Sequence, residues 1–214
     1  MNENLNLSDI IKKCNNITYK NFTKVISYLN KINYNRSSKG YIANMIEDYF
    51  FVQNKNKAEC DFPNLGIELK TLPLNEKNEP INSVFICSFF PNLSSIKWKN
   101  SLLYNKTRHI LWIPYYNHYQ DIVKYKFLKP FFYNMYYDDE IIIKNDWYNL
   151  LNCFYSGNFN KLYDFGNFLQ LKIHSKTKND FIIVFDKYGS KRVMPRLAFY
   201  FKKNFVKSLY DKFS

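Results

Sequence analysis

Two acidic side chains and one amine lie close together in the string DFPNLGIELK, as Asp61, Glu68 and Lys70. Side chains alternate across a β-strand, so Glu68 and Lys70 would share one face while their apolar neighbours project into the core. Asp61 lies seven residues before Glu68, and a Pro-Asn-Leu-Gly turn can fold the chain back between them. We therefore expect the two carboxylates to meet around one cation, with the amine beside them.

Hydrolysis of a phosphodiester needs these groups. Asp61 and Glu68 would supply hard oxygen ligands to Mg²⁺, which keeps bound waters and offsets the charge that develops in the transition state. Lys70 would orient the attacking water and contact the scissile phosphate. The alternative is that this spacing arose by chance, because an acid and a lysine on an exposed strand are more often a weak, solvated ion pair.

The segments around these residues predict the elements that hold them. GIELKTLPL (66–74) alternates as a strand does, and helices are expected over 20–32 and 40–51. In the second helix, Ile42, Met45, Ile46 and Tyr49 share one face. Glu47 lies about 100° or more from that face at 3.6 residues per turn, so it is directed toward a cleft or solvent.

Further elements complete a mixed pattern. Aromatic and β-branched runs predict strands at VFICSFF (84–90), HILWIPY (109–115), NFLQLKIH (167–174) and FIIVFD (181–186). Asp138 and Asp139 offer an N-cap for a helix that ends near Gly157, and residues 202–213 read as a closing helix. Because strands and helices do not alternate strictly, we expect a mixed α/β (α+β) fold with a central sheet.

Composition narrows the function classes. The formal net charge of +13 fits a polyanion partner, although an AT-rich coding sequence could also produce the many Asn, Lys, Ile, Tyr and Phe residues. No long apolar run and no signal peptide are seen, so we expect a soluble, cytoplasmic protein with no membrane contact. Four scattered cysteines and three histidines without ligand spacing argue against a zinc site.

Several longer blocks occur in an order shared with a known family. They are SKGYIANMIEDYF (38–50), DFPNLGIELKTLPL (61–74), EPINSVFIC (79–87), Trp98 followed by HILWIP (109–114), NDWYNLL (145–151), FLQLK (168–172) and PRLAFYFKKNF (195–205). On these blocks the chain resembles the MutH family and its relatives among the GATC-specific restriction endonucleases of the PD-(D/E)xK superfamily. The resemblance implies a restriction-endonuclease-like fold: a central mixed sheet flanked by helices, and two lobes that form a DNA-binding cleft.

The resemblance also implies residue roles. Asp61 and Glu68 match the family's metal-binding acids, Lys70 its catalytic lysine, and Glu47 its helix-borne active-site glutamate. The expected DNA-binding residues are the matches to its basic positions and to its methylation-sensing tyrosine, namely Lys39, Lys106, Lys172 and Tyr200. For each there is a plainer alternative: a solvated carboxylate for Glu47, ordinary lysines, and a core tyrosine for Tyr200.

The chain departs from the family pattern where base recognition is expected. An arginine-proline pair is replaced by Lys172-Ile173, so guanine recognition would need a single lysine donor, or His174 or Lys176 nearby. Residues 177–194 show little likeness to the repair enzymes and have a more strand-like composition, and PRLAFY is one residue longer than the family's shorter form. These changes affect recognition and leave the metal site intact.

The resemblance implies a single endonuclease domain, with a catalytic lobe over about 1–110 and a DNA-recognition lobe over about 111–214. It implies a monomeric, Mg²⁺-dependent enzyme that nicks the unmethylated strand of double-stranded DNA at hemimethylated GATC and leaves a 5′ phosphate. MutL would activate it, with MutS acting upstream. The alternatives are a GATC-specific type II restriction endonuclease and, from another class, a DNA-binding module that has lost catalysis.

Overall fold

The computed structural model describes residues 5–28, 40–52, 58–90, 97–117, 124–158, 162, 165–174, 180–185 and 188–214. The chain forms two compact units that interleave along the sequence. Unit 1 comprises Met1–Asn82, Arg108–Asn134 and Tyr210–Ser214, and unit 2 comprises Ser83–Thr107 and Met135–Leu209. The expectation that catalysis belongs to the residues up to about 110, and DNA recognition to those after it, stays a prediction.

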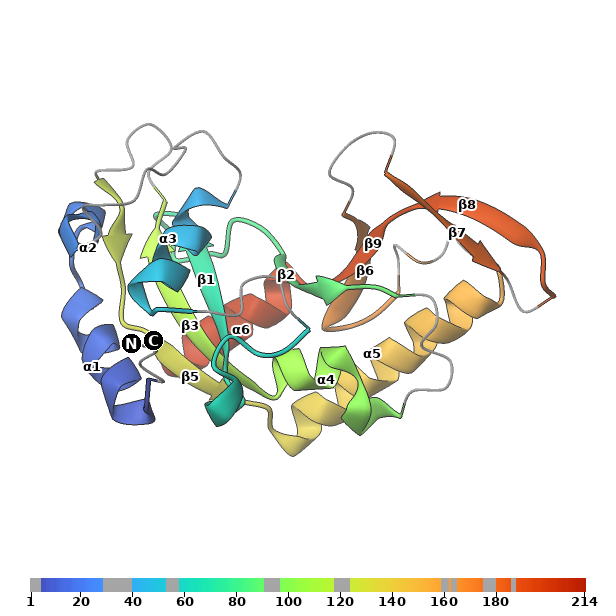
Figure 1. Cartoon of the computed structure of the whole chain (residues 1–214), viewed down its shortest axis with the longest axis horizontal. Helices are drawn as coiled ribbons and strands as arrows, with labels where there is room; N and C mark the ends of the chain where they lie inside the picture. Colours follow the sequence, from blue (N-terminus) through green and yellow to red (C-terminus); the bar gives the residue numbers. More distant parts are fainter. Residues whose placement is uncertain are drawn as a thin grey trace. The chain divides into compact units, whose positions relative to one another are not determined.

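Unit 1 is built on a mixed four-stranded sheet (Figure 1). β1 (Glu68–Leu74) runs parallel to β3 (His109–Tyr116), and Glu68 is paired with Ile110. The short strands β4 (Lys126–Phe127) and β5 (Phe131–Asn134) both run antiparallel to β3. The strands expected at 66–74 and 109–115 are confirmed, and so is the mixed α/β class.

Three helices accompany this sheet: α1 (Leu7–Ile17), α2 (Phe22–Tyr28) and α3 (Tyr41–Tyr49). The expected helix over 20–32 is confirmed as α2, and its last residues lie outside the described part of the chain. In α3, Met45, Ile46 and Tyr49 are buried and Ile42 is partly buried against the same core, as its spacing predicted. α3 packs on β1, the strand that carries the candidate catalytic residues.

Unit 2 contains an antiparallel sheet in which β9 (Leu197–Phe201) lies between β2 (Val84–Ser88) and β6 (Leu169–Ile173). A separate hairpin pairs β7 (Phe181–Phe185) with β8 (Lys191–Pro195). The strands expected within 84–90, 167–174 and 181–186 are therefore confirmed. The closing helix is α6 (Lys203–Phe213), which begins in unit 2 and ends in unit 1.

The long helix α5 (Tyr137–Tyr155) corrects one expectation. Its N-cap is Tyr136, which makes no side-chain cap, whereas Asp138 and Asp139 lie inside the first turn. Acidic side chains there still favour the helix, because they face the positive end of its dipole. The end was predicted correctly: Gly157 adopts a left-handed φ of +73° and its N–H donates to the Phe154 carbonyl.

Among the described residues, Asp146 and Glu140 each join α5 to other parts of unit 2 through polar contacts. The Asp146 carboxylate is 1% exposed and accepts the backbone N–H groups of Asn167, Phe168 and Leu169 at 2.7 to 2.9 Å. This fixes the chain at the entry to β6, which packs on α5. A buried carboxylate with several N–H donors is well satisfied, so Asp146 is assigned a structural role.

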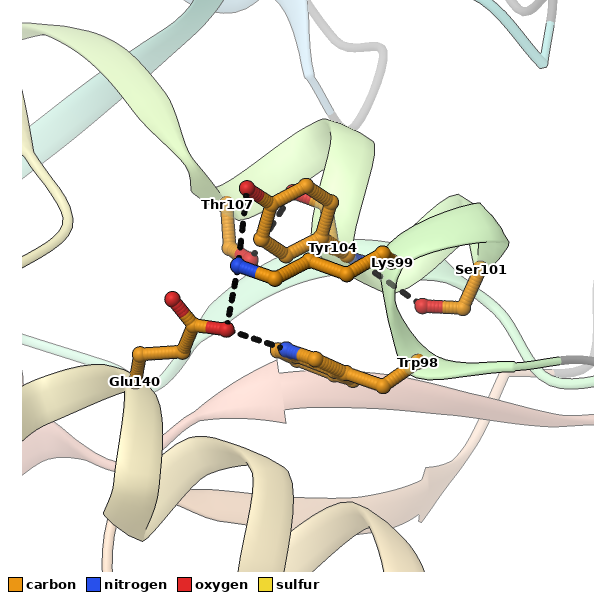
Figure 2. A network of polar contacts seen from close by, with 6 residues as sticks. All are labelled: Trp98, Lys99, Ser101, Tyr104, Thr107 and Glu140. Carbon is orange, nitrogen blue, oxygen red and sulfur yellow. Dashed lines mark hydrogen bonds and ion pairs between the residues drawn. The ribbon is translucent and has the colours of Figure 1, made fainter. Parts of the chain in front are cut away.

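The second contact lies at the start of α5 (Figure 2). Glu140 accepts a hydrogen bond of 2.9 Å from the Trp98 indole N–H. It also forms an ion pair with the Lys99 ammonium, at 2.6 Å. Trp98 and Lys99 belong to the 3₁₀ turn η3 (Trp98–Asn100), which precedes α4 (Leu102–Thr107). The Lys99 hydrogen bond holds the pKa of Glu140 below its usual value, and Glu140 raises the pKa of Lys99.

Candidate active site

β1 brings an acid and an amine together. The Lys70 ammonium lies 2.7 Å from Glu68 Oε1, and the two side chains are 14% and 3% exposed. Ile67 and Leu69 are buried in the apolar core of unit 1, as expected from strand alternation. A pair this buried loses more hydration than a surface pair does, so it is unlike the solvated ion pair that chance spacing would give.

Asp61 is brought to the same strand by a tight turn. Phe62 and Ile67 form a two-way antiparallel bridge around the 3₁₀ turn η1 (Pro63–Leu65), and Gly66 closes the turn with a left-handed φ of +63°. Asp61 Oδ2 then accepts the backbone N–H of Leu69 at 2.8 Å. The turn predicted between the two acids is thus present, and it holds the Asp61 carboxylate against the backbone between Glu68 and Lys70.

The donor chemistry of this arrangement fits a hard divalent cation. Asp61 and Glu68 provide carboxylate oxygens from adjoining stretches of backbone, and such ligands suit Mg²⁺. Glu47 lies on α3, which packs on β1, and its side chain is partly exposed. Within the described ranges, no three His, Cys, Asp or Glu residues are grouped closely enough to hold an ion, so Glu47 does not form a three-acid cluster with the other two.

Tyr200 and Lys172, expected at the DNA, lie in a cluster in unit 2. The Tyr200 hydroxyl is 2.8 Å from His174 Nδ1, and the His174 ring stacks on Phe85 with centroids 4.5 Å apart. Phe85 on β2 is also paired with Tyr200 on β9. The Lys172 ammonium donates to Ser83 Oγ at 2.7 Å and lies 5.7 Å from the centre of the Tyr200 ring.

The surroundings of Tyr200 bear on the alternative that it is a core tyrosine. Its side chain is only partly buried and its hydroxyl meets an exposed histidine, so it is not a core tyrosine. Partial burial raises the pKa of Tyr200 above its ordinary value. Sequence reasoning missed Phe85, and the signal that the sequence offered was its place in the aromatic run VFICSFF.

The other two expected DNA contacts differ in their surroundings. Lys106 on α4 is 7% exposed, which is low for a lysine that reaches a phosphate. Lys39 lies outside the described residues. Both remain predictions.

A strand that carries Glu-x-Lys and runs parallel to its neighbour in a mixed sheet, with an aspartate turned back onto it, is the arrangement of restriction-endonuclease-like proteins. The fold and the site define this class. In addition, no helix among the described residues has the length and apolar character needed to cross a membrane.

Comparison with known proteins agrees with this class. The model of the family described as DNA mismatch repair enzyme MutH matches residues 50–146. The DNA mismatch repair protein MutH of Buchnera aphidicola subsp. Baizongia pistaciae is 32% identical over 177 residues, which is 80% of each chain. The Actinobacillus pleuropneumoniae serotype 5b protein of that name is 29% identical over 182 residues, 83% of this chain and 80% of the other. The one from Shewanella oneidensis is 24% identical over 212 residues, 97% and 95% of the two chains. The chain therefore belongs to the MutH family.

Proposed function

We propose that this chain is a Mg²⁺-dependent DNA endonuclease that nicks the unmethylated strand at hemimethylated GATC during mismatch repair. The observation that carries the proposal is the placement of Asp61 against β1, the strand on which Glu68 pairs with Lys70. Asp61 is bound to the Leu69 amide, between Glu68 and the lysine that pairs with it. Membership of the MutH family supplies the reaction class.

In the proposed mechanism, Asp61 and Glu68 hold the divalent ion, and Glu47 has an active-site role from α3, the helix that packs on β1. The ion, when bound, supplies a Lewis acid that activates water and offsets charge on the phosphate. Lys70 sits at the carboxylate of Glu68, where its N–H groups orient the attacking water and contact a phosphate oxygen. The water oxygen bonds to phosphorus and its proton passes to solvent, the P–O3′ bond breaks, and O3′ takes a proton from solvent, so the products are a 5′ phosphate and a 3′ hydroxyl.

Strand choice is assigned to the unit 2 cluster. Tyr200 would pack against the adenine edge, where an added methyl group changes the fit. Lys172, held toward Ser83, is a single donor in place of a forked arginine, and His174 beside Tyr200 is a second donor. Lys39 and Lys106 are assigned to phosphates of the duplex.

The same proposal includes the protein partners and the setting. We assign double-stranded DNA as the substrate, MutL as the activating partner and MutS as the protein that acts before it. The enzyme is proposed to work as a monomer in the cytoplasm. The net charge of +13 supports the DNA contact, because cations that meet phosphates release bound counterions.

The test is strand-resolved cleavage of unmodified, hemimethylated and fully methylated GATC duplexes with Mg²⁺, with and without MutL. We expect nicks in the unmethylated strand only, faster with MutL, and none in the fully methylated duplex. Paired cuts in unmodified DNA regardless of MutL would instead indicate a restriction endonuclease. Salt-sensitive binding without any Mg²⁺-dependent product would indicate an inactive DNA-binding module.

A further inference from the structure

Arg108 is a cation of unit 1 that the proposed mechanism does not use. It directly precedes β3, and two residues later Ile110 is paired with Glu68 on β1. Arg108 therefore lies near the first residue of β1, Glu68, at the end of the strand where the proposed catalytic acids are found. Its guanidinium reaches the turn that links Asp61 to Glu68, because it packs against Gly66 in that turn.

The contact with Gly66 is close. A Cβ at position 66 would lie 2.6 Å from Arg108 Nη2, 3.4 Å from Cζ and 3.6 Å from Nε. With a side chain there, the end of Arg108 would have to shift, since the Cβ would come closest to Nη2. Glycine is favoured here by the left-handed φ of +63°, and its lack of a side chain leaves room for the end of the Arg108 side chain.

One atom of this guanidinium is left without a partner. Arg108 Nε is buried and has no hydrogen-bond acceptor among the residues that the structure describes. A buried N–H without an acceptor is costly, and a charged one more so. Nε and Nη2 form the edge with which arginine binds two oxygens of one phosphate, so the atom that lacks an acceptor belongs to the edge suited to an anion.

We propose that Arg108 is a phosphate-binding residue beside the catalytic acids and takes a phosphodiester of the DNA backbone. This deepens the proposed function and rests on it. Arg108 neutralises a phosphate next to the site and, through Gly66, braces the turn that sets the separation of Asp61 and Glu68. Replacing Arg108 should therefore change the affinity for DNA and the salt dependence of that affinity. The cleavage step is assigned to Lys70 and the two acids.

The experiment measures binding of a hemimethylated GATC duplex over a salt series, with Ca²⁺ in place of Mg²⁺ so that chemistry does not interfere. Arg108→Gln is compared with Arg108→Lys and with Lys12→Gln, a control that removes one exposed cation from α1. We expect Arg108→Gln to weaken affinity about tenfold and to lower the salt slope by about one. Arg108→Lys keeps the slope and loses part of the affinity, because lysine lacks the fork.

The proposal would be overturned if Arg108→Gln had the same DNA affinity and the same salt slope as Lys12→Gln. A lower melting temperature of Arg108→Gln would not rescue it, because a residue that only braces the turn leaves the salt slope unchanged. Should Arg108→Gln fail to fold, Arg108→Lys decides: binding equal to wild type overturns the forked contact. Nicking by Glu68→Ala with Mg²⁺ would remove the proposed function separately. The Arg108 measurement involves no cleavage, so the two failures are distinguishable.

Discussion

Lys70 and Glu68 lie two residues apart on β1 and form an ion pair of 2.7 Å in which the carboxylate is almost fully buried. Their proximity follows from strand alternation. Because the pair is buried, it should contribute to the stability of the fold as well as to the proposed catalysis. Removing one partner leaves the other charge in a poorly hydrated place.

The first prediction separates the contribution of this ion pair to stability from its contribution to nicking. Lys70→Met should abolish nicking and lower the free energy of unfolding by roughly 3 kcal/mol, because the buried Glu68 carboxyl group loses its ammonium partner. The double variant Glu68→Gln/Lys70→Met should recover much of that stability and none of the activity. Urea unfolding and a nicking assay measure the two effects. Equal stability of Lys70→Met and wild type would contradict the weight given to burial.

The second prediction concerns Asp61, whose carboxylate accepts the Leu69 amide and is proposed to hold the ion. Asp61→Asn retains an oxygen for the Leu69 N–H and loses the charge, so the fold should survive while the Mg²⁺ concentration needed for nicking rises at least tenfold. Asp61→Ala should lose the turn contact as well, and about 1 kcal/mol of stability. A Mg²⁺ titration of nicking compares the two, and an unchanged requirement in Asp61→Asn would exclude Asp61 as a ligand.

The third prediction concerns strand choice. Tyr200→Phe removes the hydroxyl that contacts His174 and keeps the ring against Phe85, so preference for unmethylated over methylated strands should fall by about tenfold. Tyr200→Ala should remove nearly all of it. Tyr148→Phe on α5 is the matched control, since that tyrosine is exposed and lies outside the cluster. Full discrimination by Tyr200→Ala would remove Tyr200 from the reading of methylation.

A fourth prediction concerns Asp146. Asp146→Asn places an amide where three backbone N–H groups converge, so one oxygen acceptor is lost and the remaining donors oppose an NH₂ group. We expect a loss of about 2 to 4 kcal/mol in unfolding free energy, measured by urea denaturation. The turnover of the folded fraction should be unchanged, and a lower turnover at full folding would point to a direct role in the reaction.

The last prediction is a pH dependence. Because Lys99 lowers the pKa of Glu140, the stability from this contact is present above the usual glutamate pKa of 4.5 and is lost as pH falls through the lowered value. Because the pKa of Lys99 is raised, its contribution fails only in strongly alkaline solution. Melting temperatures should show Glu140→Gln destabilised at neutral pH and equal to wild type in acid, with a smaller gap at high salt.

Asp138→Asn is the control for that series, since Asp138 is exposed on the same first turn of α5. It should show only the small helix-dipole effect of a first-turn acid. A loss in Glu140→Gln that persists unchanged into acid would mean that packing, and not charge, holds η3 to α5.

What the sequence could supply was local. Alternation on one strand was enough to place Lys70 beside Glu68, a four-residue turn was enough to bring Asp61 to the Leu69 amide, and apolar spacing was enough to orient α3. The start of α5 was misjudged because Asp138 and Asp139 suit both an N-cap and a first turn, and local preference does not separate the two.

Contacts between distant segments could not be derived in this way. Arg108 meets Gly66 only because β3 pairs with β1, and Phe85 meets His174 only because β9 lies between β2 and β6. The short strands β4 and β5 are likewise set by pairing with β3, since two to four residues carry too little pattern to predict a strand.

The most direct measurement is strand-resolved cleavage of a hemimethylated GATC duplex by wild type and Glu68→Ala at the same ordinary Mg²⁺ concentration, with DNA affinity measured in parallel. We expect the wild type to nick the unmethylated strand, and Glu68→Ala to bind the duplex and leave both strands intact. Cutting by Glu68→Ala at the wild-type rate would contradict the site on β1.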